Sequence, residues 1–257
     1  MNKTSIEWCD VSWNPVTGCL HPCRWEYCYN TMKATAVLRR FGACYKNHDG
    51  KKVYEKNWIS RETGENHIAR RGEIYPYGFD PTFYPHRLEQ PTKEKNSMKI
   101  FVVDTGDLFG AWVPAGWILS IIEIAKACPH HTFLFLTKNP KRYLEFEFPI
   151  NAWVGTSVTC NNDKGRAEIL KQVTAKVRFL SIEPLLGKVS IDFKCIQWII
   201  VGAQTGKKPL RPKTEWIEDI LSQANKLGIP VFLKQNLKLY YSHCIQQFPE
   251  TDQFLLN

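Results

Sequence analysis

The feature that most restricts the fold is a regular alternation, from residue 99 onward, of short apolar runs with amphipathic stretches. The apolar runs have the length of strands, and we predict strands at residues 99–104, 132–137, 152–156, 177–181, 197–201 and 230–234. The segments between them have helical spacing, and we predict helices at residues 115–127, 140–145, 163–173 and 214–226. Continuously apolar strands that alternate with helices indicate a parallel sheet buried on both faces.

A further strand is predicted at residues 4–8. It brings the number to about seven, which is enough for a partial or full (β/α) barrel of the TIM type. The chain has 257 residues, 44% of them hydrophobic, and can bury a sizeable core. It contains no clear repeat, low-complexity tract or linker. We therefore predict a single α/β domain over residues 1–257, with mostly parallel strands.

The stretch between the first strand and the alternation has a different character. After residue 28 the apolar spacing predicts a helix that ends near Gly42. Residues 43–98 lack periodicity but contain many aromatic and basic residues, and they are too aromatic for plain disorder. We predict an irregular insertion there that packs on the domain and covers its site.

Nearly every predicted strand ends in polar residues or glycine. These ends are residues 104–107, 137–139, 156–157, 181–183, 202–206 and 234–235. The carboxyl ends of parallel strands converge on one face of an α/β fold, and ligands bind at that face. The sequence therefore predicts a ligand site lined by six polar strand ends.

Three cysteines, Cys19, Cys23 and Cys28, lie within ten residues after the first predicted strand, so we expect them on the same face. The N-terminus has no signal-peptide pattern and no apolar run could span a bilayer, so we place the protein in the cytoplasm, away from membranes. Cysteines stay reduced there, and the nine in this chain favour metal binding or catalysis over disulfides. Closely spaced thiolates favour soft centres, here zinc or an iron–sulfur cluster.

The net charge of +9 suits a polyanionic partner, and basic pairs such as Arg70 and Arg71 lie among aromatic residues. An ordinary basic protein has the same charge, because net charge reports a tendency to associate and not a site. The charge is equally compatible with a nucleic-acid or nucleotide-like substrate and with the absence of any such partner.

Short motifs in a fixed order run through the chain from residue 4 to residue 235. They are Ile6-Glu7-Trp8, residues 13–19, Cys28-Tyr29, and residues 79–83, 106–110, 136–138, 154–158, 181–185 and 232–235. In order and spacing they resemble the radical S-adenosylmethionine (radical SAM) superfamily. More closely, the chain is similar to the phage-associated and prokaryotic three-cysteine-motif family of radical-SAM-like proteins.

The resemblance implies that Cys19, Cys23 and Cys28 hold a [4Fe–4S] cluster whose fourth iron binds S-adenosylmethionine. An electron from a reduced donor of the flavodoxin or ferredoxin type would cleave S-adenosylmethionine to methionine and a 5′-deoxyadenosyl radical, which abstracts a substrate hydrogen. The cysteine spacing is C-x3-C-x4-C, whereas C-x3-C-x2-C is usual in the superfamily. Residues 24–27 occupy the longer gap.

The resemblance also implies cofactor-binding residues at the strand ends. Thr105, Gly106 and Asp107 resemble the glycine-rich turn whose acid takes the methionine amino group. Further contacts are implied for Lys138 with the methionine carboxylate, Thr156 and Ser157 with ribose or carboxylate oxygens, Glu183 with a ribose hydroxyl or substrate amine, and Gly202 and Gln204 with the adenosine. The structural alternatives are a helix cap for Asp107, a solvated Lys138, turn hydroxyls at 156–157 and an ion pair for Glu183.

Candidate substrate contacts lie at three further places. His86 and Arg87 could bind a substrate phosphate, or pair at the surface with Glu89. Lys234 and Gln235 could face the substrate, or make an ion pair or hydrogen bond at the barrel rim. Cys160 could donate a hydrogen atom to a product radical, or be an uninvolved thiol.

Two other functions compete with the radical SAM interpretation. A closed zinc site made by Cys19, His21, Cys23 and Cys28 would fit a non-catalytic nucleic-acid-binding protein. A degenerate barrel could instead keep an iron–sulfur cluster for structure or electron transfer. The substrate and the oligomeric state stay open in all three cases.

Overall fold

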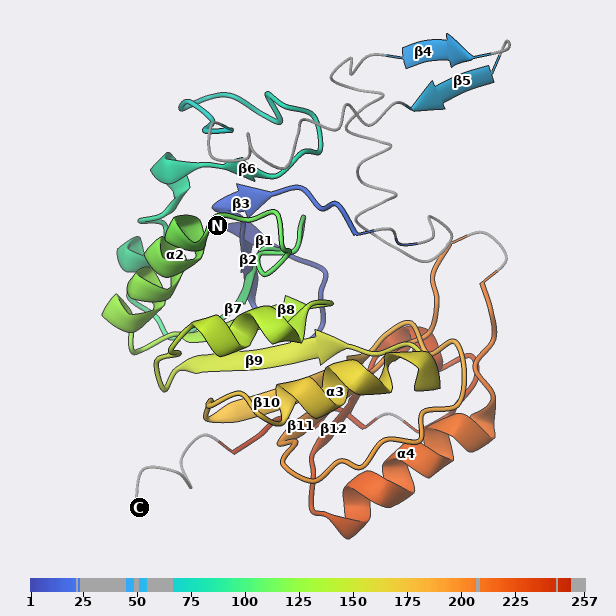
Figure 1. Ribbon diagram of the computed structural model, residues 1–257. Coiled ribbons are helices and arrows are strands. Elements are labelled where there is room, and N and C mark those ends of the chain that lie inside the picture. The colour runs from blue at the N-terminus through green and yellow to red at the C-terminus, as the bar shows by residue number, and fades with distance from the viewer. Residues whose placement is uncertain are drawn as a thin grey trace.

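One eight-stranded sheet, whose strands follow each other in sequence order, forms the centre of the fold (Figure 1). The computed structural model describes residues 1–21, 23, 45–48, 51–54, 67–206, 209–243 and 245–250. The strands are, in order, β1 (Asn2–Lys3), β2 (Val11–Trp13), β7 (Lys99–Val102), β8 (Thr132–Thr137), β9 (Ala152–Ser157), β10 (Val177–Ile182), β11 (Trp198–Val201) and β12 (Val231–Leu233). β1 is antiparallel to β2, and all other neighbours are parallel. The predicted α/β class with mostly parallel strands is confirmed.

The helices connect the parallel strands. The α-helices are α2 (Ala115–Ala127), α3 (Lys164–Leu170) and α4 (Thr214–Lys226). The short 3-10 helices are η2 (Pro85–Arg87), η3 (Pro91–Lys93), η4 (Pro140–Glu145), η5 (Asn161–Asp163) and η6 (Gln235–Leu237). In the parts of the chain that the structure describes, none of these helices has the length and apolar character that crossing a bilayer requires.

The predicted helices agree closely with the observed ones. α2 and α4 have the predicted bounds. α3 ends at Leu170, before the predicted end, because the chain there turns through 3-10-type hydrogen bonds such as that from Val173 N–H to the Leu170 carbonyl. The helix predicted after residue 28 lies outside the described residues.

Within the segment 43–98, where an irregular insertion was predicted, the described residues include two strand pairings. β4 (Tyr45–His48) and β5 (Lys51–Tyr54) pair as an antiparallel hairpin. β6 (Thr82–Phe83) pairs with β3 (Val16–Thr17), directly before the first of the three cysteines. The β3–β6 pair therefore holds the later part of the segment next to the cysteine loop.

The strand predicted at residues 4–8 is wrong, because this segment forms no strand and the chain enters the parallel sheet at β2. Glu7 instead accepts hydrogen bonds from the backbone N–H of Gln235, at 2.9 Å, and from the side chain of Gln246. No strand pairing joins β12 to β1 or β2 within the described ranges, so the sheet is open there. The segment 4–8 thus links the two ends of the sheet through side chains.

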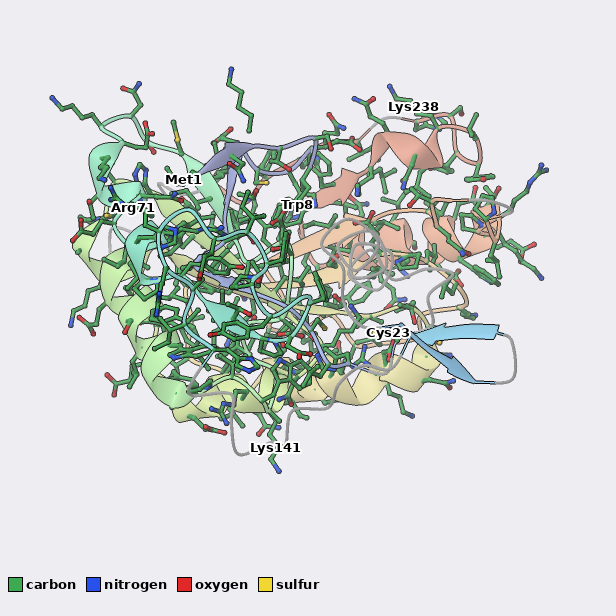
Figure 2. The ribbon with its side chains drawn as sticks, turned by 90° about the horizontal axis from the view of Figure 1, so that it is seen from above. Met1, Trp8, Cys23, Arg71, Lys141 and Lys238 are labelled. Atoms are coloured by element: carbon green, nitrogen blue, oxygen red, sulfur yellow. The ribbon has the colours of Figure 1, made fainter. Side chains whose placement is uncertain are left out.

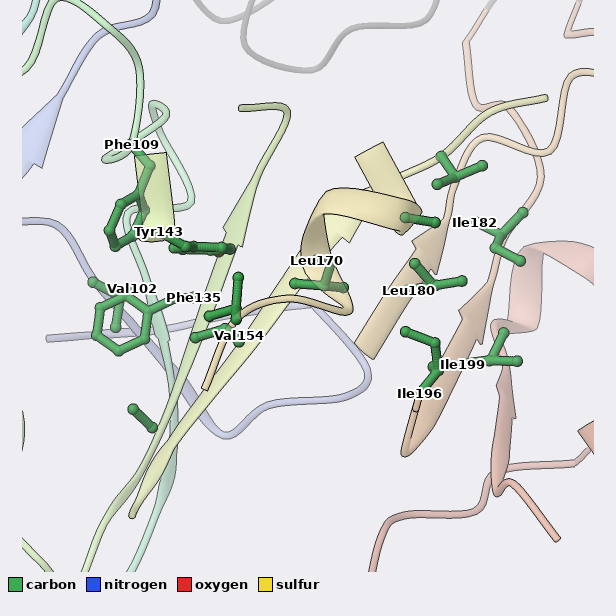
Figure 3. Close-up of a cluster of buried hydrophobic side chains, with 14 of the residues drawn as sticks. Val102, Phe109, Phe135, Tyr143, Val154, Leu170, Leu180, Ile182, Ile196 and Ile199 are labelled. Carbon is green, nitrogen blue, oxygen red and sulfur yellow. The ribbon is translucent and has the colours of Figure 1, made fainter. Parts of the chain in front are cut away.

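The three α-helices α2, α3 and α4 cover one face of the sheet (Figure 1). Crossovers between parallel neighbours share one hand, so strands in sequence order place their helices on the same side. Alternate strand residues point toward this face and pack against helix residues (Figure 3), for example Val154 of β9 and Leu180 of β10 near Leu170 of α3. Burial of each such side chain stabilises the fold by about 1.5–3 kcal/mol.

The remaining strand positions form a second core on the opposite, inner face. Its buried members are Trp8, Phe101, Leu134, Trp153, Val177, Phe179, Trp198, Ile200 and Phe232. Trp198 is fully buried, with the rings of Trp153 and Phe179 centred 5.7 and 5.6 Å from its own. Trp8 reaches this core from the N-terminal segment, near the middle of the molecule seen from above (Figure 2).

Candidate functional site

A cavity of about 420 Å³ lies at the carboxyl ends of the parallel strands. Each of the six strands β7 to β12 contributes a polar side chain to its lining, at or just after its end. These include Asp104, Lys138, Ser157, Glu183, Thr205 and Lys234. A cavity of this volume falls in the range that holds small-molecule ligands and cofactors.

The inner face changes from aromatic to polar along the strands. Side chains alternate between the two faces with a period of two, so every second residue of a strand faces inward. On β9 these residues are Trp153, Gly155 and Ser157. On β10, Phe179 is followed at the same spacing by Ser181 and Glu183. The aromatic core therefore forms a floor beneath a polar cavity.

Two glycines fix the loop that carries the first cysteine. The backbones of Gly18 and Gly106 form a parallel bridge, and Gly18 N–H donates to the Thr105 carbonyl at 3.0 Å. A Cβ on Gly106 would lie 2.6 Å from the Gly18 carbonyl oxygen, so this approach requires glycine. Cys19, the next residue, is 9% exposed and lines the cavity together with His21.

The structure describes two of the three predicted metal ligands. Cys19 is in the cavity wall and Cys23 is half-buried, whereas Cys28 lies outside the described residues. In the described ranges, no three His, Cys, Asp or Glu side chains are grouped as metal ligands would be. Phe79 packs against Cys19, with Tyr75 and Trp112 around them. The Cys19 thiol therefore lies in a largely aromatic environment.

The Gly18→Ala variant is expected to lose about 2–5 kcal/mol of unfolding free energy. The φ angle of Gly18 is +93°, where a Cβ costs about 1–2 kcal/mol. That Cβ would also lie 2.5 Å from the Asp80 backbone carbonyl, and such overpacking costs a further 1–3 kcal/mol or so. Urea unfolding followed by circular dichroism measures the loss.

Gly165→Ala is the matched control, because Gly165 lies in α3 and a Cβ there meets nothing within 4 Å. This exchange is expected to stabilise the protein by up to about 1 kcal/mol. Equal urea midpoints for Gly18→Ala and the wild type would contradict the close packing of the cysteine loop.

Asp107 is a buried carboxylate that accepts four hydrogen bonds. Oδ1 accepts from the Thr137 hydroxyl at 2.7 Å and from Phe109 N–H at 3.1 Å. Oδ2 accepts from Lys138 N–H at 2.9 Å and from His21 Nε2 at 2.7 Å. Burial alone would raise the pKa of Asp107, but the hydrogen bond and charge of His21, with the other donors, outweigh burial and lower it. Asp107 is therefore held as the anion.

His21 connects Asp107 to the cysteine loop. An ionised carboxylate only accepts hydrogen bonds, so His21 donates through Nε2 and carries its proton there. The imidazole also meets Trp112 edge-on, with ring centroids 4.8 Å apart. His21 lies between Cys19 and Cys23 in the chain, so this contact ties the loop to the end of β7. In the closed zinc site considered above, His21 could not ligate the metal through Nε2, because this nitrogen already donates to Asp107.

Glu183 and Lys234 form an ion pair at the opposite part of the cavity, between the ends of β10 and β12. Their side chains are 24% and 16% exposed, so both are largely desolvated. Gly202 leaves the space that Glu183 occupies, since a Cβ there would lie 2.9 Å from the Glu183 side chain. The structure thus contains the ion pair that was the structural alternative for Glu183.

Several residues predicted to contact ligands are not among those that line the cavity. They are Thr105, Thr156, Cys160, Gly202, Gln204, Gln235, His86 and Arg87. The Thr156 hydroxyl donates to the Thr137 carbonyl at 2.8 Å, which places it between β8 and β9. Gln204 Oε1 accepts from Leu210 N–H at 2.9 Å. The first of these contacts places Thr156 inside the sheet.

Arg87 has a structural environment away from the cavity. Its guanidinium lies 3.7 Å from the Tyr84 ring centroid and donates to the Asn14 carbonyl at 3.1 Å. Burial lowers the pKa of Arg87. Its neighbour His86 lies with it on η2. Arg87 thereby fixes the chain before β3.

Among the lining residues, Asp104 and Ser181 belong to the polar strand ends predicted at residues 104–107 and 181–183, although neither was named there as a ligand contact, whereas Trp8 was not expected at the site. Ser181 follows Phe179 by two positions, so the alternation of β10 was a sufficient signal. Asp104 stands at the end of β7, where polar residues were expected. No local signal identified Trp8, because the segment 4–8 was expected to be a strand.

Comparison with known families gives one match. A family model described as "Protein of unknown function (DUF5131)" matches residues 3–245, which includes every strand of the main sheet except the first residue of β1. No curated protein and no solved structure matches the chain.

Proposed function

The chain belongs to the DUF5131 family of proteins of unknown function, and from its cavity we propose a radical SAM-type iron–sulfur enzyme. One observation carries the proposal: Cys19 lies in the wall of a cavity that is lined by the ends of six parallel strands. An open sheet of seven parallel strands with helices on one face is compatible with a partial (β/α) barrel. We place the enzyme in the cytoplasm, with a flavodoxin- or ferredoxin-type electron donor.

In this proposal Cys19, Cys23 and Cys28 would hold a [4Fe–4S] cluster, and three thiolate ligands would leave one iron without a protein ligand. When bound and reduced, the cluster supplies the electron that cleaves S-adenosylmethionine to methionine and a 5′-deoxyadenosyl radical. The hydrogen-abstraction substrate is a nucleic acid, a nucleotide or another molecule, and the net charge of +9 favours an anionic one.

The residues of the chain bind, orient and shield the ligand. Lys138 lies at the cavity wall and suits a carboxylate. Ser157 and Ser181 face inward and can hydrogen bond with ribose hydroxyls. The aromatic floor around Trp198 keeps water from reaching the cavity from below.

Iron analysis of anaerobically purified protein tests the proposal. We expect brown protein with about four irons per chain, and release of 5′-deoxyadenosine when S-adenosylmethionine and dithionite are added. Cys19→Ala and Cys23→Ala are expected to lose nearly all of this iron, because each removes a thiolate ligand. Cys195→Ala is the control, since Cys195 is exposed and is absent from the cavity lining. Colourless protein with one zinc per chain would refute the proposal.

A zinc-containing, non-catalytic nucleic-acid-binding protein is the second candidate. One observation favours it: a carboxylate commonly accepts a hydrogen bond from a zinc-bound imidazole, and Asp107 accepts one from His21. In that case His21 would ligate zinc through Nδ1. The metal content distinguishes the two candidates directly.

A further inference from the structure

Three carboxylates line the cavity, and two of them are already engaged within the protein. Asp107 accepts four hydrogen bonds, two on each oxygen, which matches the capacity of a carboxylate. Glu183 is paired with Lys234. The third is Asp104, at the end of β7.

Asp104 has an unused oxygen. Its Oδ1 accepts from Asn14 Nδ2 at 2.5 Å, while Oδ2 has no hydrogen-bond partner and the side chain no ion pair within the described ranges. The residue is half-buried, so its charge is only partly screened by water. Trp8 lines the same cavity at 3% exposure, and its indole N–H likewise has no partner there. Asp104 Oδ2 and the Trp8 indole N–H are thus two polar atoms of lining residues without a partner among the described residues.

The orientation of Asp104 is set by Asn14. The amide oxygen of Asn14 accepts from Thr105 N–H at 3.2 Å and from the Thr105 hydroxyl at 3.0 Å. The amide nitrogen must then face Asp104, which fixes Oδ1. Asn14 is itself only 9% exposed, so this arrangement is rigid. Thr105 therefore orients Asn14, and Asn14 in turn orients the carboxylate of Asp104 before a ligand binds.

We propose that Asp104, and not Asp107, is the carboxylate that binds the cationic group of the cavity's ligand. The inference rests on the proposed function, in which that group is the ammonium of S-adenosylmethionine. A charged hydrogen bond to this ammonium requires an accessible lone pair, which Asp104 has and Asp107 lacks. The position of Asp107 in the motif favoured it as the partner of the ammonium. Its carboxylate instead accepts a hydrogen bond from His21 and so holds the cysteine loop.

Equilibrium dialysis of the anaerobically purified holoprotein tests this assignment with two ligands. S-adenosylmethionine carries the ammonium, whereas 5′-methylthioadenosine lacks the whole amino-acid part. Asp104→Asn keeps an oxygen for Asn14 but loses the charge, and it is expected to weaken S-adenosylmethionine binding about 10- to 100-fold. Binding of 5′-methylthioadenosine and the iron content are expected to stay at the wild-type level. Asp219→Asn, on exposed α4, is the matched control.

The outcomes separate this inference from the proposed function. Wild-type protein that binds no S-adenosylmethionine overturns both. Wild-type binding with an unchanged affinity in Asp104→Asn overturns the assignment of Asp104 alone, and so does an equal loss of both ligands. Asp104→Glu, which keeps the charge, checks against a general disturbance of the cavity. It is expected to bind S-adenosylmethionine more tightly than Asp104→Asn, and the reverse order overturns the assignment.

Discussion

Asp107→Ala is expected to lose about 3–5 kcal/mol of unfolding free energy and, if the protein holds the proposed cluster, most of its iron. The exchange leaves the Thr137 hydroxyl, two backbone N–H groups and His21 without their buried acceptor. His21 is then no longer tied to the end of β7, so the cysteine loop loses its anchor. Chemical unfolding measures the stability, and colorimetric iron analysis measures the metal.

Asp163→Ala separates the two effects. Asp163 also accepts from a backbone N–H and a hydroxyl, both of Thr159, and pairs with Arg166, and none of these contacts is with the described part of the cysteine loop. This control is expected to lose stability while keeping its iron. If Asp107→Ala kept the iron of the wild type, Asp107 would not position the cysteine loop.

The lowered pKa of Asp107 also gives the wild type a defined acid sensitivity. The folded pKa lies below the unfolded value of about 3.9, so the ionised form stabilises the fold. This contribution is complete above the unfolded pKa and is lost as the pH falls through the lowered folded pKa. The gap in stability between wild type and Asp107→Ala is therefore expected to be widest near neutral pH and to narrow below about pH 4.

The second large effect is expected for Trp198→Ala, at about 3–5 kcal/mol of unfolding free energy. Trp198 is fully buried among Trp153, Phe179 and Phe232, so its removal leaves a void in the inner core. Its indole N–H also donates to the Gln247 carbonyl at 2.8 Å, which would lose this donor. Chemical denaturation followed by far-ultraviolet circular dichroism measures the change.

Trp216→Ala is the control for this exchange, because Trp216 is only half-buried, on α4. Its loss is expected to cost less than about 2 kcal/mol. Similar losses for the two tryptophans would mean that the inner core is not tightly packed around Trp198.

The part of the fold after residue 99 follows from local patterns. The apolar strands and amphipathic helices there are long enough for hydrophobic spacing to determine their type, and α2, β8 and α4 have the predicted bounds. The segment 4–8 was predicted incorrectly because its apolar residues pack by side chains alone. Trp8 enters the inner core and Glu7 contacts Gln235, and no local pattern distinguishes such a segment from a strand.

For the candidate site, the sequence predicts the polar lining but not the contacts of its carboxylates. Polar strand ends and a period of two suffice to predict a polar cavity above an aromatic floor, with Ser157 and Glu183 in its wall. The different hydrogen-bond partners of Asp104 and Asp107 could not be predicted, because these partners lie far away in the sequence. His21 lies 86 residues before Asp107, and Asn14 lies 90 residues before Asp104.

The link between Glu7 and the last part of the sheet has a consequence for biosynthesis. Glu7 and its partner Gln246 are separated by 239 positions in the chain. At about 5–20 residues per second, the ribosome needs roughly 10–50 s to produce that partner. During most of this interval Trp8 lacks Trp198 and Phe232, two members of the inner core that lie late in the sequence. The cavity is thus completed only after Lys234, the lining residue that comes last in the chain, has been made.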